Sequence, residues 1–138
     1  MKALSLALAA NLAAGCAATQ KEPPPKPFVG TRWQVVLELP PAGEQPTFRF
    51  GDGRVEGFAG CNQVMARFVQ DTVGAKAIVI GRIEAGRRDC DASARATESH
   101  VLGVLQAVSS YNIIADTMTM TGSAGTLRFR ALPDGTRP

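Results

Sequence analysis

Hydrophobic residues recur at every second position over several stretches of this chain, which is the period of a β-strand with one buried face. The first stretch, 30–39, ends at a Pro-Pro pair, and the second, 47–58, is interrupted by the turn sequence Gly51-Asp52-Gly53. Two alternating segments around a glycine-rich turn predict a β-hairpin. We expect the large apolar residues of these stretches to face the core: Trp33, Val35, Leu37, Leu39, Phe48, Phe50, Val55 and Phe58.

The period changes once along the chain. Shorter strands are expected around 64–68 and 77–83, but over 91–110 apolar and small residues recur at intervals of three and four. That spacing predicts one helix with an apolar face, with Asp91 or Ser93 as its N-cap. The residues of this face are Ala94, Thr97, Val101, Val104, Leu105 and Val108.

Strand patterns return at 113–114, 117–120 and 126–130, with a turn at 122–125. Several short antiparallel strands and one helix predict an α+β fold. We expect a small, mostly antiparallel, strongly curved sheet or partial β-barrel closed by the helix. Residues 28–132 suffice for one such domain with a modest core, and 133–138 form a polar tail.

The first 15 residues have the pattern of an export signal that is too short to span a bilayer. Lys2 precedes an apolar run, and the run ends in Leu-Ala-Ala-Gly-Cys at 12–16. This ending resembles the lipobox of bacterial lipoproteins, in which the cysteine becomes the acylated first residue of the mature chain. We therefore predict a signal peptide at 1–15 and lipidation at Cys16. The alternative is an ordinary secretory signal with a coincidental cysteine.

Residues 16–27 are polar and rich in proline, with nothing to bury. They are predicted to form an extended tether, at about 3.1 Å per residue, between lipid and domain. A ligand for an aromatic groove is the alternative for such a stretch. Ala17 stands where an inner-membrane sorting signal would place Asp, so the lipoprotein resemblance implies an outer-membrane address facing the periplasm.

The charge balance argues against nucleic acid as a partner. The chain has 15 Lys and Arg against 12 Asp and Glu, or +3, and loss of Lys2 with the leader leaves +2. This charge is too small, and too evenly spread along the sequence, to predict nucleic-acid binding or strong attraction to anionic lipid. The densest basic point, Arg87-Arg88, has acidic neighbours and is interpreted as a solvated loop, with an anion or lipid-headgroup site as the alternative.

No catalytic or metal-binding motif is present in the sequence. His100 is the only histidine and is expected at the edge of the apolar helix face, so no zinc-binding pair and no relay with a second histidine can form. The segment 122–125 lacks the Gly-x-Ser-x-Gly spacing of a nucleophile elbow. We expect no enzymatic activity, no cofactor and no metal.

Two cysteines, Cys61 and Cys90, remain in the domain. With no histidine or further cysteine close by they fall short of a metal site, and neither belongs to a Cys-x-x-Cys motif. In an oxidising compartment a disulfide is the simplest outcome, and two buried free thiols are the alternative. Closing a loop of about 30 residues would contribute about 3.5 kcal/mol to stability.

Residues across the domain form a pattern similar to the META domain, the family of the heat-shock protein HslJ. The pattern comprises Gly30-x-x-Trp33, Phe50, Val55-x-Gly57-x-Ala59-Gly60-Cys61-Asn62, Cys90, Glu98, Val101-Leu102, Leu105 and Tyr111. The chain departs from it at 86–89, at Val64, where an aromatic residue is usual, and at Ala66, where glycine is common.

The resemblance implies a β-rich, partly barrel-like domain with a cysteine pair, found on secreted or lipid-anchored bacterial proteins. It also implies links to heat shock and to novobiocin resistance, and no defined reaction. We therefore expect a monomeric, non-enzymatic envelope lipoprotein that acts in envelope integrity, stress tolerance or antibiotic resistance by binding a protein or small ligand. Gly57, Gly60 and Asn62 are interpreted as structural, with a surface binding role for their loop as the alternative.

Two other functions are consistent with a small lipid-anchored β-barrel. One is a periplasmic lysozyme inhibitor, although the serine- and tyrosine-containing loop of that class is not apparent. The other is a carrier of a small apolar ligand, which requires a continuous cavity lined by Trp33, Phe48, Phe50 and Phe129.

Overall fold

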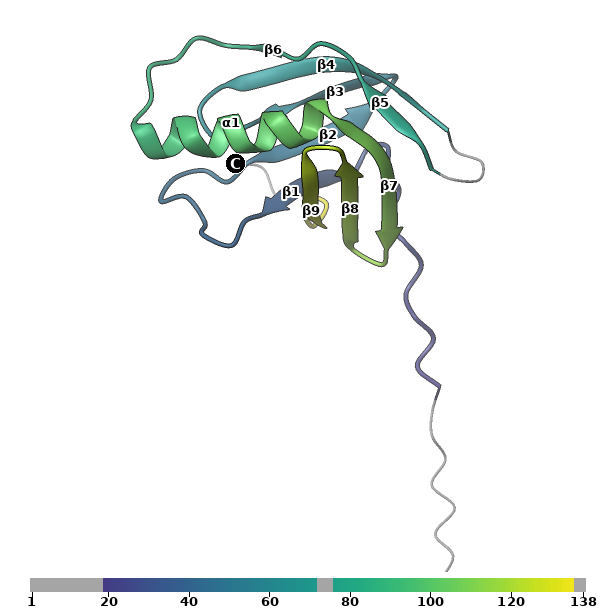
Figure 1. The fold of residues 1–138 in the computed structure, drawn as a ribbon. Coiled ribbons are helices and arrows are strands. Elements are labelled where there is room, and N and C mark those ends of the chain that lie inside the picture. The colour runs from purple at the N-terminus through teal and green to yellow at the C-terminus, as the bar shows by residue number, and fades with distance from the viewer. Residues whose placement is uncertain (1–18, 72–75, 136–138) are drawn as a thin grey trace, which may run out of the picture.

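Antiparallel strands joined by short turns make up most of the computed structural model, which describes residues 19–71 and 76–135 (Figure 1). The described part contains nine strands and one helix. In chain order they are β1 (Arg32–Val36), β2 (Thr47–Gly51), β3 (Arg54–Phe58), β4 (Gln63–Gln70), β5 (Ile78–Ile80), β6 (Glu84–Ala85), α1 (Ala92–Gln106), β7 (Val108–Ile114), β8 (Thr117–Gly122) and β9 (Gly125–Ala131).

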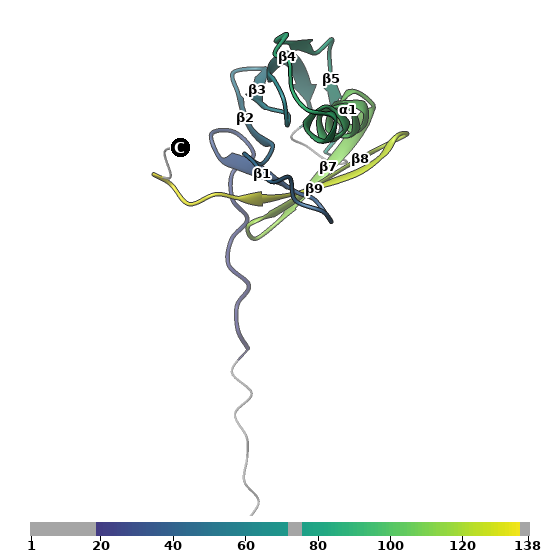
Figure 2. The ribbon, with the colours of Figure 1, turned by 90° about the vertical axis from the view of Figure 1, so that its left-hand side faces the viewer.

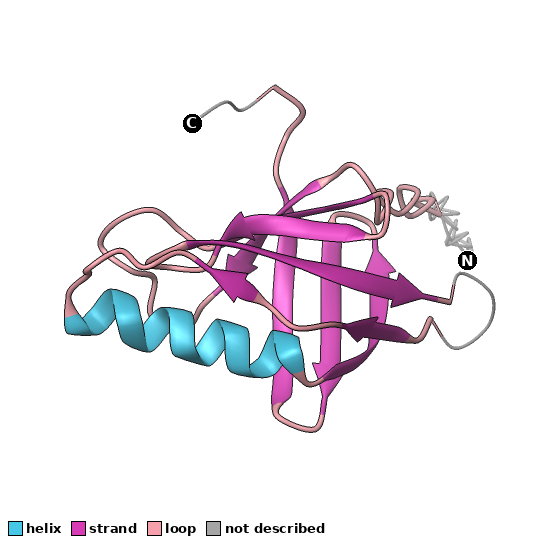
Figure 3. Cartoon of the chain, turned by 90° about the horizontal axis from the view of Figure 1, so that it is seen from above, coloured by secondary structure: helices cyan, strands magenta, loops and turns pink. Residues whose placement is uncertain are grey.

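The strands form one sheet in the order β5-β4-β3-β2-β1-β9-β8-β7, with β6 paired to β4. The two edges approach each other, since Ala77 bridges Ser110 and the Tyr111 N–H donates to the Lys76 carbonyl oxygen at 3.1 Å. The sheet therefore curls into a nearly closed barrel, with α1 across one side (Figure 3). The predicted α+β partial barrel closed by one helix is confirmed.

Aromatic side chains fill the interior of the barrel. Trp33, Phe50 and Phe129 are 0% exposed and Phe48 is 1% exposed. Phe48 and Phe129 meet edge to face with ring centroids 6.3 Å apart, a favoured geometry for aromatic pairs. The helix adds Val101, Val104 and Leu105 to this core, and α1 packs on β8 and β9.

The chain enters the sheet through a second aromatic cluster. The Phe28 ring packs 4.5 Å from that of Phe50 and 4.6 Å from that of Tyr111, measured between centroids. The indole N–H of Trp33 donates to the Phe28 carbonyl oxygen at 3.2 Å, so the one polar group of this buried side chain has a hydrogen-bond partner. Phe28 thus fixes the point at which the folded domain begins.

Three details of the sequence prediction are wrong. β1 ends at Val36 and Leu39 is 88% exposed, because β2 pairs only with 32–34 and no strand covers the residues beyond Val36. The predicted helix ends at Gln106, and Val108 is buried as the first residue of β7. His100 is exposed rather than partly buried.

Residues 19–27 lie outside the sheet and are exposed throughout (Figures 1 and 2). Only their end is held, where the Lys26 N–H donates to the Ala115 carbonyl oxygen in the β7–β8 turn at 2.8 Å. The predicted leader and its lipidation site, Cys16, lie outside the described residues. Within the described ranges, no helix has the length and apolar character needed to cross a membrane.

Candidate functional site

The motif Gly60-Cys61-Asn62 forms the tight connection between β3 and β4, pressed against the side of α1. Gly60 has a φ of +123°, a region that side chains rarely adopt, and a Cβ there would lie 3.0 Å from Thr97 Cγ2 and 3.2 Å from the Glu98 nitrogen. Both the backbone conformation and the close approach to the helix therefore require glycine at this position.

Gly57 has a packing role inside the sheet. It lies opposite Phe48 of β2, and a Cβ there would overlap the Thr47 carbonyl oxygen and lie 2.8 Å from Phe48 Cα. Its missing side chain is what lets the ring of Phe48 fill the barrel.

The Asn62 side chain is 6% exposed and makes all its contacts within the domain. Its Nδ2 donates to Glu98 Oε1 at 2.9 Å, and its Oδ1 accepts from the Arg88 N–H at 2.7 Å. The second Glu98 oxygen accepts from the N–H groups of Asn62, at 2.6 Å, and Cys61, at 3.2 Å. The Ala59 N–H donates to the Asn62 carbonyl oxygen at 3.0 Å, which closes the turn.

Asn62 thus joins three segments that are far apart in sequence: its own turn, the loop before α1, and α1 itself. The sequence pattern included Glu98 but gave it no role. The position of Glu98, one helical turn before the buried Val101, could have indicated its role in the sequence, because a carboxylate on the inner side of a helix needs hydrogen-bond partners. The geometry supports a structural role for Asn62.

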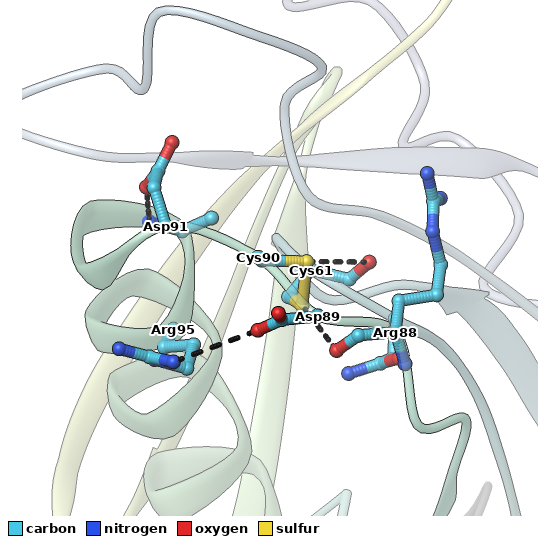
Figure 4. A network of polar contacts seen from close by, with 8 residues as sticks. Cys61, Arg88, Asp89, Cys90, Asp91 and Arg95 are labelled. Atoms are coloured by element: carbon cyan, nitrogen blue, oxygen red, sulfur yellow. Dashed lines mark hydrogen bonds and ion pairs between the residues drawn. A yellow bond between two sulfur atoms is a disulfide. The ribbon is translucent and has the colours of Figure 1, made fainter.

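The disulfide predicted between Cys61 and Cys90 is present, with a Cα–Cα distance of 6.0 Å (Figure 4). Cys90 directly precedes Asp91, the N-cap of α1, whose carboxylate accepts from the Ala94 N–H at 2.8 Å. The bridge therefore ties the β3–β4 turn to the first turn of the helix. The nearby Arg95–Asp89 pair, at 3.9 Å between exposed side chains, adds little to stability.

We call the set Gly60, Cys61, Asn62, Cys90 and Glu98 the brace. The Glu98 carboxylate, the Asn62 side-chain amide and the backbone N–H groups of Cys61 and Asn62 all have hydrogen-bond partners within the domain. Within 19–71 and 76–135, no group of three or more His, Cys, Asp or Glu side chains is placed to hold a metal ion. The brace thus fixes the helix against the sheet.

A groove of about 740 Å³ lies between α1 and the strands β1 and β9, and we call it the helix–sheet groove. Its apolar side chains include Leu39, which is 88% exposed, and Val36, which is 48% exposed. The full lining is Val36, Leu37, Glu38, Leu39, Ala96, Thr97, His100, Thr126, Leu127 and Arg128. Apolar residues beside a few charged and polar ones are typical of a binding surface.

The structure bears on both alternative functions. The four aromatic residues that a carrier would need around a cavity fill the barrel instead, and they leave at most 1% of their surface exposed. The single tyrosine, Tyr111, packs in the core at 9% exposure and cannot be presented on an inhibitory loop. Burial and the negative charge of Asp71 raise the pKa of its phenol.

Two solved structures resemble this domain. One is an NMR structure of a protein from Burkholderia xenovorans, with a TM-score of 0.62, 19% identity, and coverage of 80% of this chain and 85% of that chain. Another NMR structure of a protein gives a TM-score of 0.56 at 13% identity, over 72% of this chain and 87% of that one. At these identities the likeness shows a shared fold.

Sequence comparison places the chain more specifically. No curated protein sequence matches it. The family model of the META domain matches residues 26–133, a range that contains the whole barrel, the brace and the helix–sheet groove. This chain therefore belongs to the META domain family.

Proposed function

We propose that this chain is a non-enzymatic lipoprotein of the cell envelope, anchored through Cys16 to the outer membrane and facing the periplasm. Its META domain would serve envelope integrity, stress tolerance or novobiocin resistance by binding a protein or a small ligand. The observation that carries the proposal is the Cys61–Cys90 disulfide within the brace. Structural disulfides persist in oxidising compartments and are rare in the cytosol.

The segment before the domain supports the anchored arrangement. Residues 19–27 are exposed and include three consecutive prolines at 23–25. An extended proline-rich chain advances about 3.1 Å per residue, so the 12 residues from Cys16 to Pro27 would span about 40 Å. That length lets the domain reach envelope components while it stays attached to the membrane.

The helix–sheet groove supports the binding role. Leu39 and Val36 expose apolar surface beside the charged Glu38 and Arg128, so a ligand or protein segment with apolar and polar parts can be held there. These residues lie on β1 and β9 and on the connection after β1.

The anchor is tested by feeding an alkyne analogue of palmitate to the native host and detecting labelled protein. The natural chain should be labelled and recovered with outer membranes, whereas Cys16→Ala should be unlabelled and absent from outer membranes. A labelled Cys16→Ala chain, or an unlabelled natural chain, would contradict the proposed anchor.

The physiological role is tested in a deletion strain exposed to heat and to novobiocin. The natural chain should restore growth, and Cys16→Ala should restore it poorly. Equal growth of the deletion and parent strains under both conditions would count against these roles.

The binding surface is tested by placing a photo-crosslinking amino acid at Leu39 in cells of the native host. Val79 is the matched control, because it is apolar and 66% exposed but lies on β5, outside the groove. A specific adduct should form from position 39 and be absent from position 79. The same adducts from both positions would show that the groove does not select its partner.

A further inference from the structure

The folded domain brings arginines side by side on neighbouring strands, although the sequence spreads its charges widely. The adjacent strands β4, β3, β2, β1 and β9 contain six arginines and one carboxylate, Glu56, which gives these strands a net charge of +5. The charge of the whole chain is only +3. We call these arginines the basic face: Arg32, Arg49, Arg54, Arg67, Arg128 and Arg130.

Strand alternation is the cause of this gathering. Each of these arginines adjoins at least one buried core residue along its strand, and successive side chains of a strand point to opposite sides, so each arginine points to the outer side of the sheet. Residues about 15 positions apart in sequence then become cross-strand neighbours. Charges that are spread along the sequence therefore lie close together on these strands of the folded domain.

The register places like charges directly opposite each other. Arg54 is paired with Arg67 and Arg32 with Arg49, whereas Glu56 is opposite Arg49. Opposed residues have Cβ atoms about 5 Å apart, and like charges at that distance are destabilising. Among the described residues, Arg49, Arg54 and Arg67 have no acidic side chain within ion-pair distance. An arrangement that is unfavourable for the isolated domain becomes favourable once an anion lies on this face.

A concavity of about 500 Å³ lies within the basic face, next to the point where the tether enters the domain. Its lining is Val29, Gly30, Arg49, Phe50, Gly51, Asp52, Arg54, Glu56 and Arg67. Val29 and Gly30 directly follow Phe28, at which the folded domain begins. Asp52 and Glu56 offset two of the three positive charges in this wall, so the Arg54–Arg67 pair is its strongest positive point.

We propose that the basic face docks the domain onto the anionic phosphate headgroups of the membrane to which the chain is tethered. This inference rests on the proposed lipid anchor for its physiological setting. The tether ends beside the arginine concavity, so this concavity lies at the point of the domain that is nearest to the lipid anchor along the chain. Attachment keeps the local lipid concentration high, so weak contacts suffice to hold the domain down.

The size of the expected effect follows from the number of arginines. One basic residue near an anionic membrane strengthens binding by about fivefold at ordinary ionic strength. Replacing both Arg54 and Arg67 with glutamine should therefore weaken binding by about 25-fold. The attraction should also fall at high salt, because the Debye length shortens.

The test uses the mature chain, residues 16–138, with Cys16→Ala, so that neither the apolar leader nor a lipid is present, and sedimentation with vesicles of phosphatidylcholine, with and without phosphatidylglycerol. The chain should bind only the anionic vesicles, and Arg54→Gln/Arg67→Gln should remove most of that binding. The matched control is Arg87→Gln/Arg88→Gln, which removes the same charge from the loop before α1, at the other end of the domain from the tether (Figure 1). Circular dichroism establishes that all variants are folded.

Three results would overturn the proposal: no binding of the natural face to anionic vesicles, an equal loss in both double variants, or full competition by inorganic phosphate at matched ionic strength. The last result would indicate a site for a free anion. Because the vesicle assay uses an unlipidated chain, its outcome is independent of Cys16 acylation, and palmitate labelling tests the anchor alone.

Discussion

Replacing Glu98 with alanine should destabilise the domain strongly, because one carboxylate holds the brace together. It accepts three hydrogen bonds, from the Cys61 and Asn62 backbone N–H groups and from Asn62 Nδ2. Bonds to a charged acceptor contribute about 1.5–3 kcal/mol each, and the loss leaves buried donors without partners. Because Glu98 is only partly buried, water replaces some of the lost bonds, and we expect a total cost of about 3 kcal/mol.

Glu98→Gln provides a sharper version of this prediction. Its single carbonyl oxygen can serve the two backbone donors, but its NH₂ group then faces Asn62 Nδ2. Flipping the Asn62 amide offers no relief, because Oδ1 already accepts from the Arg88 N–H. Glu98→Gln should lower the free energy of unfolding by about 1–2 kcal/mol, so its stability should lie between that of the natural chain and that of the alanine variant.

Urea denaturation followed by tryptophan fluorescence measures both costs, since the single tryptophan lies in the core. The control is Glu84→Ala, which removes an exposed carboxylate from β6 and should change the free energy of unfolding by less than about 0.5 kcal/mol. If Glu98→Ala also stays within about 0.5 kcal/mol of the natural chain, the brace does not stabilise the domain as argued.

The other predictions concern glycines, the disulfide and the buried phenol. Gly57→Ala should lower the free energy of unfolding by about 3 kcal/mol or prevent folding, because the new Cβ meets the β2 backbone. Gly103→Ala, in open space on α1, should raise it by about 0.5–1 kcal/mol. Thermal melts compare the two variants, and equal shifts in melting temperature would contradict this packing. Reduction of the disulfide should lower the free energy of unfolding by about 3.5 kcal/mol in urea titrations, and an unchanged midpoint would refute a bracing role. Tyr111 should titrate above its ordinary pKa of 10.0 in ultraviolet absorbance, and Asp71→Asn should lower that pKa while leaving the phenol buried. Because the pKa of Tyr111 is higher in the folded state, its contribution to the free energy of unfolding is fully present below pH 10.0 and is lost as the pH rises through the folded-state pKa. A Tyr111 pKa of 10.0 in the folded protein would contradict this burial.

Local patterns predicted the elements well where neighbouring strands were there to cover them. Phe48, Phe50 and Val55 alternate in sequence and are buried in the hairpin, and Asp91 caps the helix as its position indicated. Leu39 follows the same alternation and is exposed, because burial depends on whether another strand lies alongside. A period of two identifies one face of a strand but does not say how far its partners extend.

The candidate site was less predictable than the fold. Cys61 and Cys90 could be paired by elimination, since no other cysteine lies in the domain. The role of Glu98 could not be inferred in the same way, because its three bonds join residues 36 and 37 positions away. Such contacts depend on how the helix is placed against the β3–β4 turn.

By itself the sequence determined the type and order of the elements, the cysteine pair and the membership of a family, because these depend on local periodicity and residue identity. Only the tertiary structure decided which distant residues became neighbours. Sheet register brought Arg54 opposite Arg67 and gathered single arginines into a charged face, and helix packing turned Glu98 into the centre of the brace. Both outcomes depend on strand pairing and packing between elements, and a linear pattern of residues does not contain that information.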